Sequence, residues 1–160
     1  MSYETVQVER QNYVGTVILN RPEQFNTFNT QLAEELCKAL LELEEDKSIR
    51  VVVVKGAGKA LSTGIDLTEY AGKSQQEYRE WIGLMERVVQ IIATMKKPVI
   101  ASAHGYAVAN GAGLIAACDL AVVAKGTKIG ASAINVGLFC MGRPSPSPGL
   151  WEGSALWRWS

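Results

Sequence analysis

Apolar and polar residues alternate along the chain with periods that predict strands and helices in turn. Two runs rich in β-branched residues, 3–11 and 13–19, flank Asn12 and favour a hairpin. The next stretch, 20–29, contains Pro22 and three asparagines, which are typical of turns. The chain is therefore expected to open with two strands followed by a loop.

Two longer segments repeat apolar residues with the period of a helix. The first helix, capped by Asn29 or Thr30, is expected to run to about Asp46. The second begins with a capping box at 74–77 and is expected to end near Met95. Their spacing leaves room for a strand between them, as expected for crossover connections.

Three short, nearly unbroken apolar runs are typical of strands buried on both faces: 49–56, 98–105 and 119–125. A small-residue turn at 108–113 and a short helical segment at 114–118 separate the last two. The order β-β-α-β-α-β-α-β predicts an α/β fold, with a mostly parallel sheet covered by helices. In such folds the loops after the strands carry the chemistry, and here they are 55–66 and 104–113.

Composition and charge narrow the function classes. The 160 residues are 48% hydrophobic and 20% charged, enough apolar mass to fill a core, so disorder is excluded. Sixteen Lys and Arg balance 16 Asp and Glu, so electrostatics offers no support for nucleic-acid binding.

No apolar run approaches a membrane span or a signal peptide, and three sparse cysteines are typical of reduced thiols. A soluble cytoplasmic protein is expected. The single histidine, His104, argues against a metal site.

Three segments together resemble one family. RVVVVKGAGKALSTGIDLTE (50–69) is similar to the first signature of the crotonase superfamily, also called the enoyl-CoA hydratase/isomerase family. KPVIASAHGYAVANGAGLIAACDLAVV (97–123) is similar to its second signature, and LNRPEQFNTFN (19–29) to its N-terminal segment. The resemblance implies a crotonase-type spiral of β-β-α units with mostly parallel sheets, which agrees with the order of elements above.

The resemblance also implies a ligand and a site. The substrate would be an acyl-coenzyme A thioester, and no further cofactor or metal is implied. Two backbone amides, those of Ile65 and Asn110, would stabilise an enolate or related oxyanion at the thioester carbonyl. Asn110 and Ala109 stand where the family usually has glycine, and asparagine tolerates a positive φ at such a site better than most residues. Residues expected to border the substrate are Gly64, Asp66, Gly111 and Gly113.

The acid and base groups depart from the family pattern. The positions of the two glutamates that hydratases use are occupied here by Gly113 and Ala133, neither of which can move a proton. Hydration of a 2-enoyl-CoA, the reaction typical of the family, is therefore expected to be nearly abolished in this chain. Isomerase, thioesterase or decarboxylase chemistry would need Cys140, His104 or a bound anion instead. A catalytically silent acyl-CoA binder or an assembly subunit is the alternative.

Each of these residues also has a structural interpretation. Cys140 follows two apolar residues and fits a buried small side chain. His104, at a strand end, fits a hydrogen-bonded structural role, and Asp66 fits a cap on the next helix.

The family resemblance ends where the composition changes. Residues 1–142 are expected to form the crotonase-like core, whereas 143–160 hold three of the five prolines and three of the four tryptophans. This tail is expected to lack the family's structure and to reflect a truncation or frameshift. The family's C-terminal helical part, which completes the acyl pocket and the contacts of a homotrimer or hexamer, is then missing.

Overall fold

Strands and helices alternate along the computed structural model, which describes residues 3–69 and 72–131. The elements are β1 (Val6–Gln11), β2 (Val14–Leu19), the short 3-10 helix η1 (Pro22–Gln24), α1 (Thr30–Glu45), β3 (Val51–Gly56), the 3-10 helix η2 (Leu67–Glu69), α2 (Gln75–Thr94), β4 (Val99–Ala103), β5 (Tyr106–Val108), α3 (Asn110–Ala117), β6 (Leu120–Val123) and β7 (Lys128–Gly130). Ala133, Cys140 and the tail 143–160 lie outside the described residues.

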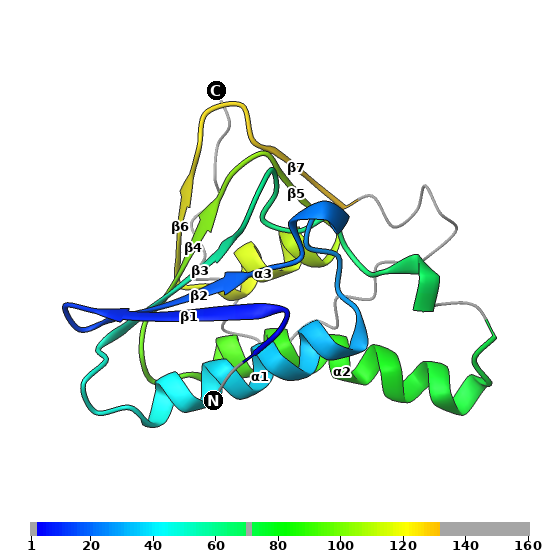
Figure 1. Cartoon of the computed structure of the whole chain (residues 1–160), viewed down its shortest axis with the longest axis horizontal. Helices are drawn as coiled ribbons and strands as arrows, with labels where there is room; N and C mark the ends of the chain where they lie inside the picture. The colour runs from blue at the N-terminus through cyan, green and yellow to red at the C-terminus, as the bar shows by residue number, and fades with distance from the viewer. Residues whose placement is uncertain (1–2, 70–71, 132–160) are drawn as a thin grey trace, which may run out of the picture.

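The main sheet has five strands in the order β1-β2-β3-β4-β6 (Figure 1). Only the β1–β2 pair is antiparallel, and β2, β3, β4 and β6 run parallel to one another. A second sheet consists of the parallel pair β5–β7. The predicted α/β class with mostly parallel sheets is confirmed.

The predicted hairpin around Asn12 is present and has a two-residue turn. Asn12 and Tyr13 have φ of 50° and 68°, the left-handed values that match the twist of an antiparallel pair. Asparagine adopts this conformation more readily than most residues, so Asn12 between two strand-like runs was enough to predict the turn.

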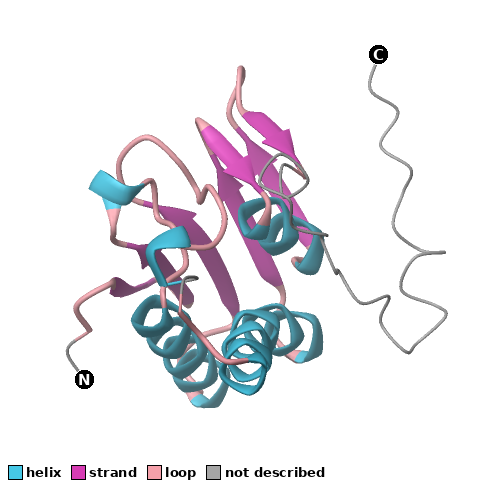
Figure 2. Ribbon diagram, turned by 90° about the vertical axis from the view of Figure 1, so that its right-hand side faces the viewer, coloured by secondary structure: helices cyan, strands magenta, loops and turns pink. Residues whose placement is uncertain are grey.

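The two long helices lie together on one side of the main sheet (Figure 2). The Asn29 side chain accepts a hydrogen bond of 2.8 Å from the Leu32 N–H, so Asn29 is the cap of α1. The predicted capping box of Ser74 and Glu77 opens α2. The core between helices and sheet is built mainly from fully buried residues of α1, α2, β2 and β3: Val17, Leu19, Leu32, Leu36, Leu40, Leu43, Val52, Val54 and Val88.

The segment after β4 differs from the expectation of one long strand, a turn and a late helix. Gly105, with φ of +61°, ends β4 and redirects the chain into β5, which joins the second sheet. A Cβ at Gly105 would overlap the carbonyl oxygen of Lys59, so glycine is required where these two loops cross. The helix α3 then begins at Asn110 rather than at residue 114, because its glycine-rich first turn packs against the neighbouring loop.

Among residues 3–69 and 72–131, no helix combines the length and the apolar character needed to cross a membrane.

Candidate functional site

The first glycine loop, residues 55–66, runs between two other segments of the chain. On one side Ser62 bridges Ala107 of β5, and on the other side Ile65 bridges Phe28. The loop therefore pairs like a short strand with one segment on each side. One of these segments is β5, which lies in the second glycine loop, residues 104–113.

The Ile65 amide points toward β5 because of how its peptide group is bonded. The Phe28 N–H donates to the Gly64 carbonyl at 2.8 Å, and the Asp66 N–H donates to the Phe28 carbonyl at 2.8 Å. In a trans peptide the carbonyl and the following N–H point in opposite directions, so the Ile65 N–H faces away from Phe28. Within the described part of the chain this N–H donates no hydrogen bond.

The second amide, that of Asn110, opens the helix α3. Ala109 precedes it with φ of 49° and ψ of −114°, and supplies no side-chain cap. The Asn110 N–H has no acceptor among residues 3–69 and 72–131, and it carries the partial positive charge of a helix N-terminus. The residue with positive φ at this turn is Ala109 and not Asn110. The strained backbone therefore lies one residue before the Asn110 N–H.

The two loops touch at the residues that precede the two donors. A Cβ at Gly64, which has φ of +109°, would lie only 2.9 Å from the Cβ of Ala109. A Cβ at Gly111 would overlap the carbonyl oxygen of Ser62, which is fully buried. Glycine at 64 and 111 thus lets the backbones of the two loops approach each other.

Gly113 differs from Gly111, although both lie on α3. A Cβ at Gly113 would meet no atom of residues 3–69 or 72–131 within 4 Å, so the described part of the chain leaves open space at this position. Its N–H is bonded to the Ala109 carbonyl at 3.0 Å and is not a free donor. Gly113 therefore offers room for a larger side chain but no polar group of its own.

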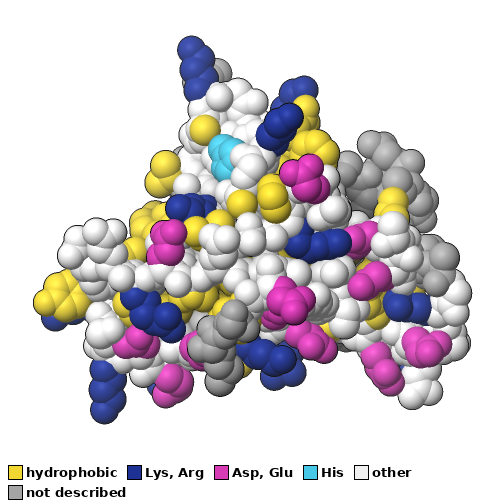
Figure 3. Space-filling model, in the orientation of Figure 1, with side chains coloured by type: hydrophobic (Ala, Val, Ile, Leu, Met, Phe, Trp, Pro, Cys, Tyr) yellow, Lys and Arg dark blue, Asp and Glu magenta, His cyan; other side chains and the backbone are white. Residues whose placement is uncertain are grey.

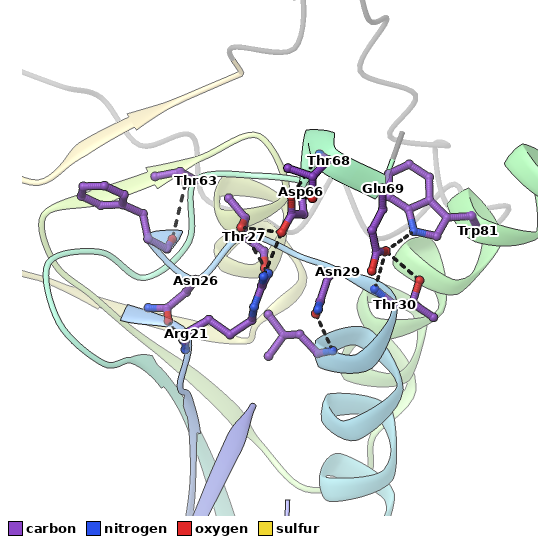
Figure 4. A network of polar contacts seen from close by, with 12 residues as sticks. Arg21, Asn26, Thr27, Asn29, Thr30, Thr63, Asp66, Thr68, Glu69 and Trp81 are labelled. Atoms are coloured by element: carbon purple, nitrogen blue, oxygen red, sulfur yellow. Dashed lines mark hydrogen bonds and ion pairs between the residues drawn. The ribbon is translucent and has the colours of Figure 1, made fainter. Parts of the chain in front are cut away.

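Asp66 is held by Arg21, Thr68 and, at the longer distance of 3.5 Å, the Thr27 hydroxyl (Figure 4). Its Oδ2 accepts from Arg21 Nη2 at 2.9 Å, and its Oδ1 accepts from the N–H and hydroxyl of Thr68 at 3.1 and 2.7 Å. Partial burial raises the pKa of Asp66, but the hydrogen bonds from Thr68 and Arg21 outweigh it and hold the pKa below its usual value. The expected role of Asp66 as a cap on the next turn, η2, agrees with these bonds.

His104 is hydrogen-bonded in a way that fits a structural role. Its Nε2 lies 2.9 Å from the carbonyl oxygen of Gly58, so this nitrogen carries a proton and donates. Of the cysteines in the described ranges, Cys37 is buried and Cys118 is half-buried. Desolvation raises the pKa of both thiols, that of Cys118 to about 12. Neither the imidazole nor these thiols are arranged as an activated base or nucleophile.

A surface hollow of about 420 Å³ opens beside the first glycine loop, lined by Phe25, Lys59, Thr63 and Tyr106. The rings of Phe25 and Tyr106 meet edge to face with centroids 6.3 Å apart. Lys128 places its Nζ 5.4 Å from the Tyr106 ring centroid. One ammonium group, that of Lys59, and the rings of Phe25 and Tyr106 therefore border this open hollow. On the face in Figure 3, positive and negative side chains are interspersed.

No group of three or more His, Cys, Asp or Glu residues is arranged to hold a metal ion in the described portion of the chain.

The mostly parallel α/β fold, with two glycine loops packed against each other, agrees with the crotonase-type fold that the sequence resembles. The family model described as enoyl-CoA hydratase/isomerase matches residues 9–144. The chain belongs to this family.

Individual relatives agree with that assignment. A Thermus thermophilus protein, provisionally named an enoyl-CoA hydratase, is 40% identical over 138 residues, 82% of this chain and 53% of its own length. A mitochondrial dienoyl-CoA isomerase of Rattus norvegicus is 34% identical over 149 residues, 86% of this chain and 46% of its own. The crystal structure of an enoyl-CoA hydratase of Mycobacterium smegmatis matches with a TM-score of 0.83 and 36% identity, covering 93% of this chain and 61% of that one. The chain thus spans about half the length of the curated relatives it matches.

The sequence predicted the two loops but missed the residues behind the first one. Arg21, Thr27 and Phe28 lie in the segment 19–29, which was interpreted as a loop and as the family's N-terminal segment, without a role for its side chains. No local pattern indicates the partner of Arg21, because Asp66 lies 45 positions away.

Proposed function

We propose that this chain binds an acyl-CoA thioester and stabilises an enolate or related oxyanion at its carbonyl through the Ile65 and Asn110 amides. The observation that carries the proposal is that both N–H groups lack acceptors within the described residues. Unpaired amides at such loops are costly unless a ligand or water receives their hydrogen bonds. Preorganised donors of this kind are the main source of stabilisation for a developing oxyanion.

The hollow beside the first glycine loop supports a coenzyme A ligand rather than a short free acid. Thr63, which lines the hollow, belongs to the same loop as Ile65 and precedes it by two residues. Lys59 supplies a charge for a phosphate, and the Phe25–Tyr106 pair supplies an apolar surface for a base or pantetheine chain. The thioester is the substrate, and the proposal needs no other cofactor and no metal.

The reaction at the bound thioester is proposed to depart from standard hydration. The relatives include proteins named crotonyl-CoA hydratase and dienoyl-CoA isomerase. In this chain the positions of the two hydratase glutamates are assigned to Gly113 and Ala133, and Gly113 has no acid or base to offer. Each general acid or base contributes typically 10²–10⁴-fold, so wild-type hydration of a 2-enoyl-CoA is expected to be slow.

A catalytically silent acyl-CoA binder or an assembly subunit is the second candidate, favoured by the absence of an acid or base at position 113. Isomerase, thioesterase or decarboxylase chemistry would require His104, Cys140 or a bound anion, and the hydrogen bond from His104 to Gly58 opposes the first of these. The family resemblance suggests a homotrimer or hexamer, which sedimentation would test. The sparse cysteines favour the cytoplasm, which cell fractionation would test.

The test is calorimetric titration with acetoacetyl-CoA beside an assay of crotonyl-CoA hydration. We expect binding, with hydration close to background. Absence of binding would overturn the proposal, and rapid hydration would overturn the part that rests on Gly113 and Ala133.

A designed pair sharpens this result. Gly113→Glu places a carboxylate in the open space, and Gly113→Gln has nearly the same size without a group that transfers protons. Gly113→Glu is expected to raise hydration about 10²-fold above Gly113→Gln. Equal rates for the pair would contradict the assignment of Gly113 to an acid–base position.

A further inference from the structure

The rear of the first glycine loop is fastened to residues 21–28, which we call the rear segment (Figure 4). The fully buried Asn26 donates from its side chain to the carbonyls of Ala57 and Ala60 at 2.9 and 2.8 Å. The Thr63 N–H donates to the Phe25 carbonyl at 3.2 Å. The rear segment therefore determines where this loop lies.

Arg21, in the rear segment, has a partly buried guanidinium that joins Asp66 of the first glycine loop to Thr27 of the rear segment. Its Nη2 donates to Asp66 at 2.9 Å, and its Nη1 donates to the Thr27 carbonyl at 2.6 Å. The Arg21 and Asp66 side chains are only 16% and 11% exposed, so solvent screens them weakly. The Arg21 backbone is itself fixed, because its N–H donates to the Asn26 side chain at 2.8 Å.

These bonds form a continuous relay that ends at the Ile65 amide. The Thr27 carbonyl, which accepts from Arg21, belongs to the same peptide group as the Phe28 N–H. That N–H donates to the Gly64 carbonyl, which belongs to the same peptide group as the Ile65 N–H. A positive charge thus lies at one end of two hydrogen-bonded peptide groups, and the donor amide lies at the other.

Such a chain has two physical consequences for the donor. Hydrogen bonds in series polarise one another, so a cation at the carbonyl end makes the last N–H a stronger donor. Gly64, at φ of +109°, has no side chain to hold its peptide plane. The direction of the Ile65 N–H therefore depends on the bonds behind it.

We infer that Arg21 is a positioning residue that, through the Thr27 and Gly64 peptide groups, aims and polarises the Ile65 N–H toward the substrate oxyanion. Asp66 holds the guanidinium in the orientation that reaches Thr27. This inference rests on the proposed function, in which the Ile65 amide receives the oxyanion.

The test measures enolate formation rather than turnover. Acetoacetyl-CoA gains a near-ultraviolet absorbance band when it becomes an enolate, and the pH at half-conversion reports how strongly the site stabilises it. Ethyl-CoA, a thioether with no carbonyl, reports binding of the coenzyme part alone. The variants are Arg21→Gln, Arg21→Lys and the matched control Arg10→Gln, whose exposed partner is Asp46 at 3.1 Å.

We expect Arg21→Gln to weaken enolate stabilisation about tenfold, in keeping with the effect of small misplacements on reacting groups. Ethyl-CoA affinity should stay as in the wild type, and Arg10→Gln should match the wild type in both measurements. Arg21→Lys keeps the charge but cannot span Thr27 and Asp66 together, so its loss should be intermediate. If Arg21→Gln fails to fold, the Arg21→Lys result decides.

If Arg21→Gln folds and its half-conversion pH equals that of the wild type, the inferred role of Arg21 is wrong. If Arg21→Gln does not fold, an unchanged half-conversion pH in Arg21→Lys overturns the inference in the same way. Equal losses for ethyl-CoA and enolate also overturn it, because they indicate a general structural role. If the wild type binds acetoacetyl-CoA without promoting the enolate, the proposed oxyanion site itself is wrong, and the relay with it. The two failures are therefore distinguishable.

Discussion

The two donor amides are supported in different ways. Ile65 lies in an irregular loop and depends on a distant segment, with the Arg21 charge behind two peptide groups. Asn110 begins the eight-residue helix α3 and depends on its own neighbours, with the helix dipole behind it. Both arrangements place partial positive charge behind an N–H group. At Ile65 the charge comes from the Arg21 side chain, and at Asn110 it comes from the backbone of α3 alone.

This difference has consequences for what each donor tolerates. The Ile65 side contains an ion pair, so it should respond to pH and to charge-changing substitutions. The Asn110 side contains a strained alanine and a close glycine contact, so it should respond to the addition or removal of a single methyl group.

The largest effect is expected from breaking the contact between the two loops. Gly111→Ala would force a methyl group onto the Ser62 carbonyl, and we expect it to lower the free energy of unfolding by about 3 kcal/mol. The matched control, Gly113→Ala, adds the same methyl group to the same helix in open space. That control should be neutral or more stable by up to ~1 kcal/mol, because alanine favours helix. Chemical denaturation measures both, and equal stability of the two variants would contradict the packing described.

A smaller effect is expected from the ion pair on the Ile65 side. Asp66→Asn removes the charge that pairs with Arg21 and should cost about 1–2 kcal/mol at neutral pH. Because the folded-state pKa of Asp66 is lowered, its stabilisation is complete above the unfolded pKa of about 3.9 and is lost as the pH falls through the folded value. The stability difference between wild type and Asp66→Asn should therefore shrink below about pH 4. A difference that stays constant through acid pH would show that the charge of Asp66 is not what stabilises the loop.

The smallest effect is expected from relieving strain on the Asn110 side. Ala109→Gly removes the Cβ from a residue at φ of 49° and ψ of −114°, and we expect a gain of about 1 kcal/mol. Ala112→Gly, inside the same helix, should lose about 0.5–1 kcal/mol because glycine is unfavourable there. Thermal unfolding of the pair gives the sign directly. A loss of stability in Ala109→Gly would mean that the backbone there is not strained.

The features predicted correctly from the sequence are those with local causes. The Asn12 turn, the Asn29 cap and the capping box of α2 depend on residues within four positions of one another, so short patterns reveal them. The two glycine loops were also found, because their small residues stand out and resemble the family signatures.

The features that were missed depend on residues far apart in the chain. Arg21 and Asp66 are 45 positions apart, and only the folded arrangement shows that they meet. Trp81 is buried and donates from Nε1 to Glu69 at 3.1 Å, a contact between residues 12 positions apart that no local pattern indicates. The start of α3 was missed because a glycine-rich first turn has low helix propensity, and packing against Ser62 overrides that propensity.

The two amides are best tested by the nuclear magnetic resonance signals of an isotope-labelled chain titrated with acetoacetyl-CoA. The amide protons of Ile65 and Asn110 should shift downfield together, because both N–H groups would donate to the same oxyanion. Ethyl-CoA, which has no carbonyl, should leave these two signals without that downfield shift. If the two ligands shift both signals equally, or if acetoacetyl-CoA moves neither, the Ile65 and Asn110 amides do not form the oxyanion site.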